Sequence, residues 1–307
     1  MLHRWRVRVD SSLLQIIRAD LIGDVAVETE RAVPFRCRPN PMSEQIWQDN
    51  RPAVLENILS AGKGLSTRDK LFSKGYMEGL YTMEKTSFYF SGDTNYAAFY
   101  DLLKQQYTGE MRDKLLDEFF HRYSERLSDK DSLLADALAG ISVPYYKQAL
   151  RVYAARSKGM PVYDFKLPGV DGREVRLSEL KDKIVFIDFY YTGCPHCIEM
   201  YKDCLHSVET YFKDNKDIVF LSISSDDSPT IWQKTVAGGL YTSPDADNVI
   251  NLNAKGWHHP FLQYYNITAY PCTLLIDRQG RIISFDDDNM RKPEYMIDAL
   301  KKAIGTN

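Results

Sequence analysis

The sequence predicts an α/β domain with a central mixed sheet flanked by helices, and a mostly α-helical domain before it. The first observation is a change of pattern at 157–161. Apolar residues recur at helical spacing before it, and short β-branched runs alternate with helices after it. The second is the apolar run at 183–190, which is typical of a strand covered on both faces. The third is the order of the later elements, which favours a sheet with a right-handed crossover.

The composition is that of an ordinary globular protein. Of the 307 residues, 44% are hydrophobic and 26% are charged, so a packed core in one large or two smaller domains is expected. The net charge of -3 provides no basic surface, so no nucleic-acid partner is expected. The chain has no run of eighteen apolar residues, and its positive N-terminus has no apolar stretch behind it. We therefore expect neither a membrane span nor a signal peptide, which leaves a cytosolic protein and an export signal outside this chain both open.

The N-terminal half divides into a mixed segment, 1–42, and a helical domain, 43–158. In the mixed segment, 4–9 alternates like an edge strand, and 32–41 contains three prolines and is expected to be a loop. No cluster of residue types in the helical domain needs a chemical explanation, so packing or partner binding is its expected role. The clearest expected helices lie at 97–107, 111–127, 131–139 and 145–155. The expected helix-starting residues are Ser43, Ser66, Asp93 or Thr94, and Pro144.

The C-terminal half, 161–307, is expected to form the α/β domain. A first hairpin joins 162–167 to 174–177 through a turn that contains proline and glycine. The elements expected after it are a strand at 183–190, a helix at 194–213, a strand at 218–224, a hairpin of 273–277 and 281–285, and a helix at 293–304.

A Cys-Pro-His-Cys motif stands where a buried strand gives way to a helix. The spacing of Cys194 and Cys197 on one helical turn lets their sulfurs form a disulfide. Unpaired N–H groups and the helix dipole stabilise a thiolate at a helix N-terminus, and the thiolate is the nucleophile. Pro195 fits the first turn, where its missing N–H costs nothing. A protonated His196 would lower the pKa of Cys194 further. We therefore expect a redox-active pair at the exposed start of a helix.

The other cysteines form no second motif. The five cysteines are Cys37, Cys194, Cys197, Cys204 and Cys272. An odd number in a chain of this size argues against a structural disulfide framework. A zinc site at the motif is the alternative, and it needs two further ligands, for which His258 and His259 are candidates. Adjacent histidines in one loop are more often solvated. Redox chemistry is therefore favoured, with no metal and no cofactor.

Residues 161–307 resemble the TlpA/ResA-like branch of the thioredoxin superfamily. Four features follow one another in the family's order: 172–181, the strand 184–189, the cysteine motif, and the segment 265–277 around Tyr-Pro-Cys. The resemblance implies a thioredoxin-like fold and thiol–disulfide oxidoreductase activity. The helical segment before this domain is similar to that of Bacteroidetes-type envelope proteins, which implies a location in the periplasm or cell envelope.

The resemblance also implies roles for further residues. Pro271 matches the family's cis-proline, which faces the cysteine pair, and the backbone of Tyr270 would pair with an extended substrate segment. Asp188 matches a buried acid that exchanges a proton with Cys197. An aspartate in an ion pair at the strand edge is the alternative for this position. His196 lies in the dipeptide that tunes the redox potential.

Several positions depart from the family's pattern. Gly193 replaces an aromatic residue that often precedes the first cysteine, so a more open site is expected. Tyr270 is bulkier than the usual Thr, Val or Ile and is expected to narrow substrate access. Cys272 stands where Thr is usual; we expect it to be buried, with a third thiol near the site as the alternative. Cys204 is expected to pack in the core, about 10 Å from the motif's second cysteine. Cys37 has no explanation.

The expected reaction is exchange through a mixed disulfide with protein substrates. The Cys194 thiolate attacks a substrate disulfide, and Cys197, deprotonated with help from Asp188, then releases the reduced substrate. The dipeptide is that of DsbA-type oxidases, whereas the TlpA/ResA-like pattern implies a reductase that receives electrons from a membrane-bound partner. We expect reduction of disulfides in envelope proteins, because the partner surface follows the architecture and the dipeptide tunes only the potential.

Three alternatives remain open at this point: a DsbA-like oxidase, a thioredoxin-like protein that handles copper or zinc, and a non-catalytic binding module. A peroxiredoxin-type site is less compatible with the sequence. Such a site needs a Thr-x-x-Cys loop, and Thr192-Gly193-Cys194 is too short.

Overall fold

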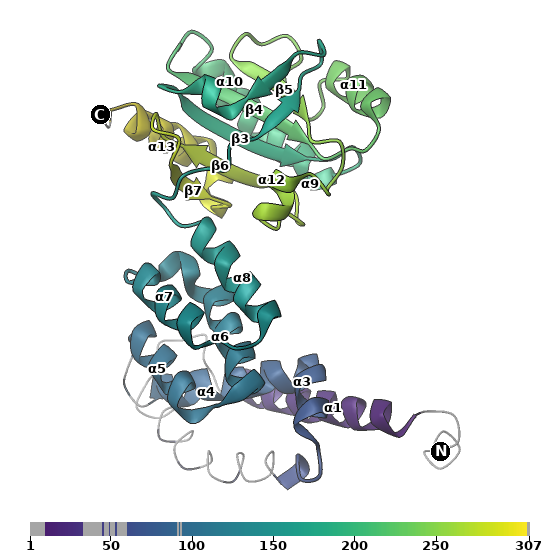
Figure 1. Cartoon of the computed structure of the whole chain (residues 1–307), viewed down its shortest axis with the longest axis vertical. Helices are drawn as coiled ribbons and strands as arrows, with labels where there is room; N and C mark the ends of the chain where they lie inside the picture. Colours follow the sequence, from purple (N-terminus) through teal and green to yellow (C-terminus); the bar gives the residue numbers. More distant parts are fainter. Residues whose placement is uncertain are drawn as a thin grey trace. The chain divides into compact units, whose positions relative to one another are not determined.

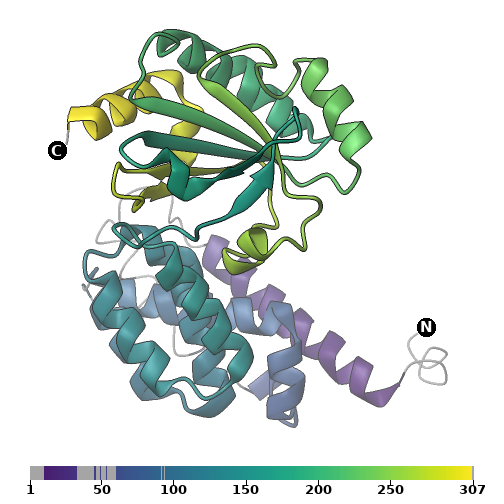
Figure 2. The same cartoon turned by 45° about the horizontal axis from the view of Figure 1, so that its top comes forward.

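The computed structural model describes residues 10–32, 45, 49, 53, 60–90, 92 and 94–305. The chain forms two compact units, Met1–Tyr153 and Ala154–Asn307 (Figures 1 and 2). The strand expected at 4–9, Cys37, and the expected capping residues Ser43 and Asp93 lie outside the described residues. Within the described part of the chain, no helix combines the length and apolar character needed to cross a membrane.

The N-terminal unit is helical. Its helices are α1 Ser11–Ala32, α3 Thr67–Phe72, α4 Lys74–Phe90, α5 Tyr96–Gln106, α6 Gly109–Tyr123, η2 Ser124–Arg126, α7 Lys130–Gly140 and α8 Pro144–Ala155. Ser66 caps α3, as predicted, through a reciprocal pair of hydrogen bonds with Asp69. The cap of α5 is Asn95, one residue after the expected Thr94, because the Asn95 side chain accepts a hydrogen bond from the Ala97 N–H.

Helix α1 lies in the segment for which the sequence predicted only mixed structure. It packs against α4 at a point where glycines allow the two backbones to approach closely. A Cβ atom on Gly23 would lie 1.9 Å from the Gly75 carbonyl oxygen, and one on Gly79 would lie 2.6 Å from the Gly23 oxygen. This helix is therefore selected by a tertiary contact, and glycine is a poor helix former when read from the sequence alone.

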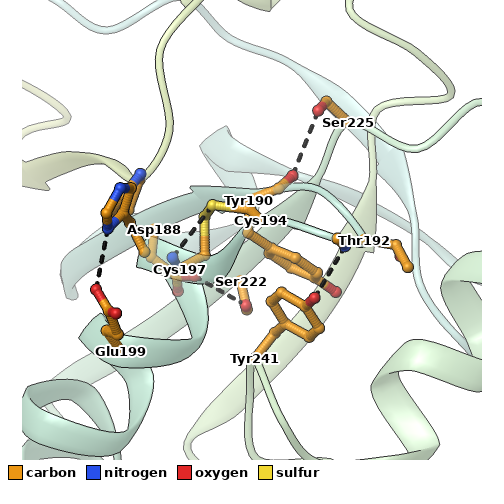
Figure 3. The surroundings of a disulfide bond; sticks show 12 residues. Asp188, Tyr190, Thr192, Cys194, Cys197, Glu199, Ser222, Ser225 and Tyr241 are labelled. Carbon is orange, nitrogen blue, oxygen red and sulfur yellow. Dashed lines mark hydrogen bonds and ion pairs between the residues drawn. A yellow bond between two sulfur atoms is a disulfide. The ribbon is translucent and has the colours of Figure 1, made fainter.

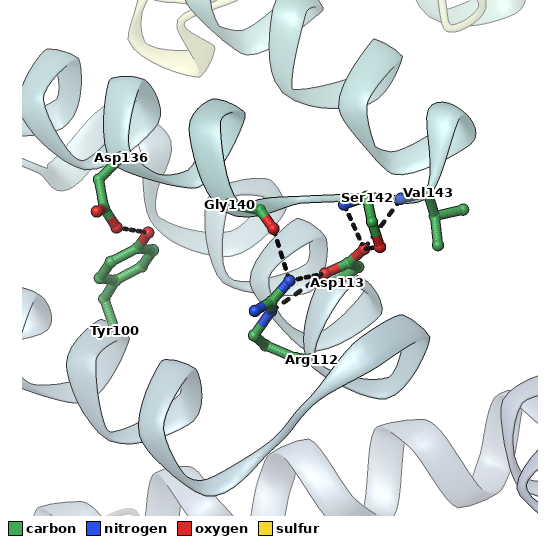
Figure 4. A network of polar contacts seen from close by, with 7 residues as sticks. All are labelled: Tyr100, Arg112, Asp113, Asp136, Gly140, Ser142 and Val143. Atoms are coloured by element: carbon green, nitrogen blue, oxygen red, sulfur yellow. Dashed lines mark hydrogen bonds and ion pairs between the residues drawn. The ribbon is translucent and has the colours of Figure 1, made fainter.

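A buried carboxylate fixes the link between α7 and α8 (Figure 4). Asp113 is fully buried and accepts hydrogen bonds from the backbone N–H groups of Ser142 and Val143, at 2.9 and 3.0 Å. The Arg112 guanidinium lies 2.8 Å from the same carboxylate and also donates to the Gly140 carbonyl oxygen. Burial raises the pKa of Asp113, but the hydrogen bonds from these groups outweigh it and hold that pKa below its usual range.

The C-terminal unit is built on one five-stranded mixed sheet in the order β5-β4-β3-β6-β7. Strands β3, β4 and β5 are parallel, and β6 and β7 are antiparallel to their neighbours. The strands are β1 Lys166–Pro168, β2 Glu174–Arg176, β3 Ile184–Tyr190, β4 Ile218–Ser224, β5 Val249–Asn253, β6 Cys272–Ile276 and β7 Ile282–Phe285. The helical elements are η3 Leu177–Leu180, α9 Pro195–Met200, η4 Tyr201–Leu205, α10 His206–Tyr211, α11 Pro229–Ala237, α12 Pro260–Tyr264, η5 Asp288–Arg291 and α13 Pro293–Gly305.

The predicted fold class is confirmed: a central mixed sheet flanked by helices follows a mostly helical region. Strand β5 and helices α11 and α12 lie in a stretch for which the sequence analysis proposed no element. The pattern of β5 is hard to recognise because Asn251 and Asn253 occupy buried positions in the strand. The segment 201–205 is a turn of π-helix, which joins α9 and α10 into one continuous helical stretch.

The central strand β3 is buried along its whole length and separates two cores. Val185, Ile187 and Phe189 face the core that includes residues of α12. Ile184 and Phe186 face the opposite core, with residues of η4, α10 and α13. Because side chains alternate along a strand, Asp188 points to the face covered by the helical stretch that carries the cysteine motif.

Candidate active site

Cys194 and Cys197 are joined by a disulfide at the end of β3 (Figure 3). Their Cα atoms are 5.4 Å apart. Cys194 is the N-cap of α9, and its Sγ accepts a hydrogen bond from the Cys197 N–H at 3.1 Å. Pro195 occupies the first turn, where no N–H is needed. The motif thus places Sγ of the first cysteine against an N–H group at the helix start, where a thiolate is favoured.

The two sulfurs are more enclosed than the sequence predicted. Cys194 is only 2% exposed and Cys197 4%, although Pro195 and His196 between them are exposed. Both cysteines pack in a small core with Tyr190, Trp232, Val236 and Tyr241, against which Tyr270 also packs. The expectation of a pair at an exposed helix start is therefore wrong for the sulfurs themselves. Large side chains from distant parts of the sequence surround the helix start.

Gly193 does not leave the site open, contrary to expectation. Its φ of 100° is accessible mainly to glycine, and its N–H donates to the Tyr241 hydroxyl at 2.9 Å. The Tyr241 ring stacks on Tyr190 with ring centres 5.3 Å apart. An aromatic side chain from the loop after α11 therefore binds the turn next to the motif and packs on the cysteines, although Gly193 itself is exposed. The preceding Thr192 is held by Asp226, which accepts hydrogen bonds from the Thr192 N–H and hydroxyl at 3.0 and 2.6 Å.

The imidazole of His196 pairs with Glu199 on the outer surface of α9. His196 Nδ1 lies 2.9 Å from Glu199 Oε2, and both side chains are exposed (Figure 3). A protonated His196 would therefore share its charge with this carboxylate. Glu199 was not among the predicted site residues, and its carboxylate offsets the expected effect of His196 on Cys194.

Asp188 is buried on β3 without a cationic partner. Its side chain is 4% exposed and accepts a hydrogen bond from the Ser222 hydroxyl at 3.1 Å (Figure 3). Burial, followed by the negative charge of Glu209, raises the pKa of Asp188 well above its usual range. The buried acid that the family resemblance implies is therefore present at this position. The alternative of an ion pair at the strand edge is wrong, since Asp188 forms no salt bridge among the described residues.

Glu209 is a second buried acid, which the sequence analysis missed. It lies on α10, is 2% exposed, and accepts a hydrogen bond from the Ser243 hydroxyl at 2.6 Å. Burial raises the pKa of Glu209 to about 7, and the Ser243 hydrogen bond opposes this rise. The available signal was its neighbour Val208 on the apolar stripe of the helix. A carboxyl beside such a stripe is expected to be solvated unless the structure shows that a loop, here the one with Ser243, covers it.

The segment that begins the hairpin of β6 lies against the cysteine core. The Tyr270–Pro271 peptide bond is cis, and the Tyr270 ring makes an edge contact with Tyr191 at 5.4 Å between ring centres. Tyr191 is 40% exposed, so this aromatic pair combines a solvent-facing member with one that packs on the cysteines. The Arg291 guanidinium donates to the Pro271 carbonyl oxygen at 3.3 Å.

The two other described cysteines, Cys204 and Cys272, are free thiols buried outside the motif. Cys272, the first residue of β6, lies in the core on the opposite face of the sheet, and burial raises its pKa. Cys204 is fully buried and its thiol lies 3.6 Å from the Met290 carbonyl oxygen, to which it donates. Burial raises the pKa of Cys204 as well. Neither thiol is placed for exchange with a substrate, in agreement with the packing roles expected for both.

The histidines considered as metal ligands have other roles. His259 caps α12 by accepting a hydrogen bond from the Phe261 N–H at 3.2 Å, and the His258 ring packs at a tilt against the Trp257 ring. Within the described ranges, no group of three or more His, Cys, Asp or Glu side chains is arranged to hold a metal ion. The metal-handling alternative therefore has no donor set in this part of the chain.

Comparison with known proteins places this site in a protein class. Residues 159–285 match the model of the AhpC/TSA family. Thiol-disulfide oxidoreductase ResA of Geobacillus kaustophilus is 25% identical over 183 residues, covering 58% of this chain and 97% of the relative. ResA of Bacillus subtilis is 21% identical over 158 residues, covering 52% of this chain and 83% of the relative.

Solved structures match about half of the chain. The thioredoxin domain of a thiol-disulfide oxidoreductase from Bacteroides vulgatus is 22% identical, covers 48% of this chain and 98% of its own, and has a TM-score of 0.40. For a thiol-disulfide oxidoreductase from Bacteroides fragilis the identity is 19%, the coverages are 46% and 98%, and the TM-score is 0.39.

The C-terminal unit is a thioredoxin-like domain of the thiol–disulfide oxidoreductase class. Within that class it is similar to the ResA proteins, and the family match includes the sheet and the cysteine motif. The family match, 159–285, includes no residue of the N-terminal unit.

Proposed function

We propose that Cys194 and Cys197 are a redox pair that reduces disulfides in proteins of the cell envelope. The observation that carries this proposal is the disulfide at the N-cap of α9, above a buried acid on β3. The Cys194 thiolate attacks one sulfur of a substrate disulfide, and the second substrate sulfur leaves as a thiolate. Cys197 then gives its proton to the Asp188 carboxylate and attacks the Cys194 sulfur, which releases the other substrate sulfur with its electron pair.

The electrostatics of the site favour reduction over oxidation. A stabilised Cys194 thiolate makes a disulfide more oxidising, and nearby negative charge has the opposite effect. Asp188 and Glu209 are both carboxylic acids, and neither forms an ion pair with Lys or Arg in the described part of the chain. The charge of His196 is shared with Glu199, 2.9 Å away. A dithiol reductant must then restore the Cys194–Cys197 dithiol, and we assign this role to a membrane-bound electron-transfer partner.

The enclosed position of the sulfurs supports a substrate that approaches along the Tyr270–Pro271 segment. In this arrangement the backbone of Tyr270 pairs with an extended substrate segment, and the Tyr191 ring beside it forms the exposed edge of the contact. Similarity to ResA proteins and to envelope proteins with a helical N-terminal segment supports a location in the periplasm or cell envelope. The helical unit itself is assigned to partner binding.

Reduction of insulin by dithiothreitol, followed by turbidity, tests the activity. Cys194→Ser is expected to abolish catalysis, whereas Cys204→Ser, which removes a buried thiol outside the motif, is expected to retain it. Insulin reduction that is no faster with wild type than with Cys194→Ser would support a non-catalytic role for the domain. The redox potential of the pair, measured against glutathione, separates the two directions: a value near −120 mV would favour a DsbA-like oxidase, and a value near that of thioredoxin, about −270 mV, a reductase.

A further inference from the structure

A row of buried polar side chains crosses the sheet beneath the helix that carries the cysteines. In register, Asp188 on β3 is flanked by Thr273 on β6 and Ser222 on β4, and Ser222 is flanked by Asn251 on β5. All four are at most 7% exposed. On one side of the row the same face continues with apolar side chains, which include Phe186, Phe220 and Leu275. On the other side it continues with Ser224 and Asn253, which are also buried.

The row continues into a hydrogen-bonded chain that contains the second acid. The Asn251 amide donates to the Ser243 carbonyl oxygen at 3.2 Å, and the Ser243 hydroxyl donates to Glu209 Oε2 at 2.6 Å. The Tyr201 hydroxyl lies 3.0 Å from the Ser243 hydroxyl and 3.2 Å from His206 Nδ1. His206 is exposed, so the chain connects a buried carboxyl with solvent.

The π-helical turn between α9 and α10 brings these groups together. Tyr201 begins this turn and His206 follows its end, which allows their side chains to meet although they are five residues apart. The turn lies between Cys197 and Glu209 in the same helical stretch. Turns of this type are frequent at functional sites.

We propose that Glu209 is a positioning residue for the exchange reaction. It acts through Asp188, whose charge it controls. The charge of Glu209 itself follows solvent pH through the hydrogen-bonded chain of Ser243, Tyr201 and His206. This inference rests on the proposed function of the cysteine pair. When Glu209 is ionised, two negative charges in one buried region disfavour each other, so Asp188 keeps its proton and cannot accept the proton of Cys197.

The groups that face the two acids leave this repulsion uncompensated. Beside Asp188 they are Tyr190 on β3 and the Ser222 hydroxyl. Around Glu209 they are the Ser243 hydroxyl and Tyr201, with His206 at the solvent end of the chain. Among the described residues, no Lys or Arg forms an ion pair with either acid. After burial, the negative charge of Glu209 is the next largest influence that raises the pKa of Asp188.

The test is the pH dependence of mixed-disulfide resolution in the full chain. A mixed disulfide of Cys194 with a peptide thiol is rapidly generated, and its release by Cys197 is followed by stopped flow between pH 5 and 9. In Glu209→Gln the half-point of the rise in rate is expected to move to lower pH, by about one pH unit, because removal of the negative charge of Glu209 lowers the pKa of Asp188. Asp203→Asn, an exposed carboxyl on the same helical stretch, is the control and is expected to keep the wild-type half-point.

A second variant avoids any change to the carboxyl itself. Ser243→Ala removes the hydrogen bond that stabilises ionised Glu209, so the half-point is expected to move in the same direction, and Ser243→Thr is expected to restore it. Identical half-points in wild type, Glu209→Gln and Ser243→Ala would overturn the inference, even with catalysis intact. Catalysis that does not need Cys194 would instead overturn the proposed function, so the two failures are distinguishable.

Discussion

Glu209 shows what a single buried residue does to the whole protein. A carboxyl with a pKa raised by burial is favoured in its protonated form in the folded chain, whereas the unfolded chain favours the ionised form at the same pH. The folded state is therefore penalised when the pH exceeds the unfolded pKa of this group. Because the hydrogen bond from Ser243 only partly offsets burial, this residue is retained at a cost to stability, which fits a role in chemistry better than one in packing.

This cost predicts a pH-dependent difference in stability between wild type and Glu209→Gln. Glu209 titrates near 4.5 when unfolded and at about 7 when folded, so wild type loses stability relative to the variant as the pH rises from about 4.5 to about 7. The expected difference is about 3 kcal/mol, and it is constant at higher pH. Urea unfolding of both proteins at pH 4.5, 6 and 8 measures it. Parallel pH profiles would contradict the burial of this carboxyl.

At the scale of elements, the turn between β3 and α9 depends on one backbone conformation. Gly193 has a φ of 100°, and no atom lies within 4 Å of the place where a Cβ would stand. The cost of a side chain here is therefore conformational and not steric. The N–H of this residue is also the donor to Tyr241, so the turn and the aromatic cover of the site depend on each other.

Gly193→Ala is expected to destabilise the protein by about 1 to 3 kcal/mol, since an L residue is forced into the left-handed region. Gly305→Ala is the matched control, because this glycine also has no atom near its Cβ position but does not have a positive φ. The control is expected to change stability by less than about 0.5 kcal/mol. Chemical denaturation of the oxidised proteins provides the comparison, and equal effects of the two substitutions would contradict the argument.

In the N-terminal unit, the α7–α8 link predicts a large effect of Asp113→Asn. The amide would present N–H groups to donors that need an acceptor and would leave Arg112 without its buried partner, so a loss on the order of 3 kcal/mol is expected. The control is Asp136→Asn, which removes the largely exposed ion pair with Lys104 but keeps an oxygen that can accept the hydrogen bond of the Tyr100 hydroxyl, so it is expected to cost less than about 1 kcal/mol. Thermal unfolding of the two variants measures both losses of stability, and equal losses would contradict the role of Asp113 as a buried acceptor (Figure 4).

At the scale of the whole molecule, the C-terminal unit begins before the family match does, at 154 rather than 159. Arg156 directly follows α8. Its Nε donates to the Tyr265 carbonyl oxygen at 3.0 Å, and a second N–H donates to that of Asn266 at 3.1 Å. The guanidinium also lies over the Phe285 ring, 4.7 Å from its centre. These contacts all lie within 154–307, so the unit that we propose as the redox domain includes this arginine.

Two truncations are expected to differ because of this residue. A fragment of 154–307 is expected to unfold cooperatively and to reduce insulin, whereas 159–307 lacks Arg156 and is expected to be less stable by about 2 kcal/mol. Arg156→Ala in the longer fragment is expected to reproduce the loss. Guanidinium unfolding of the three fragments measures it, and equal stability of the two truncations would argue that the unit begins after this arginine.

Local patterns were sufficient to determine much of this protein. The apolar run of β3, the three-residue spacing of the cysteines and the Tyr-Pro segment predicted a mixed α/β sheet and a site at the end of a strand. These features depend on the periodicity of a strand and on the geometry of one helical turn, both of which extend over a few neighbouring residues. The contiguous motif therefore pointed to Cys194 and Cys197 without knowledge of the fold, and the family resemblance added Asp188.

Only the tertiary structure decided what surrounds that motif. Helix α1 is stabilised by a close contact between glycines, and β5 is a buried strand that contains asparagines. Tyr241 covers the turn at Gly193, and Glu209 becomes a buried acid because the loop with Ser243 closes over it. Each of these depends on residues far apart in the sequence. Burial and charge coupling arise from that packing, and a local pattern contains no information on which distant side chain will cover it.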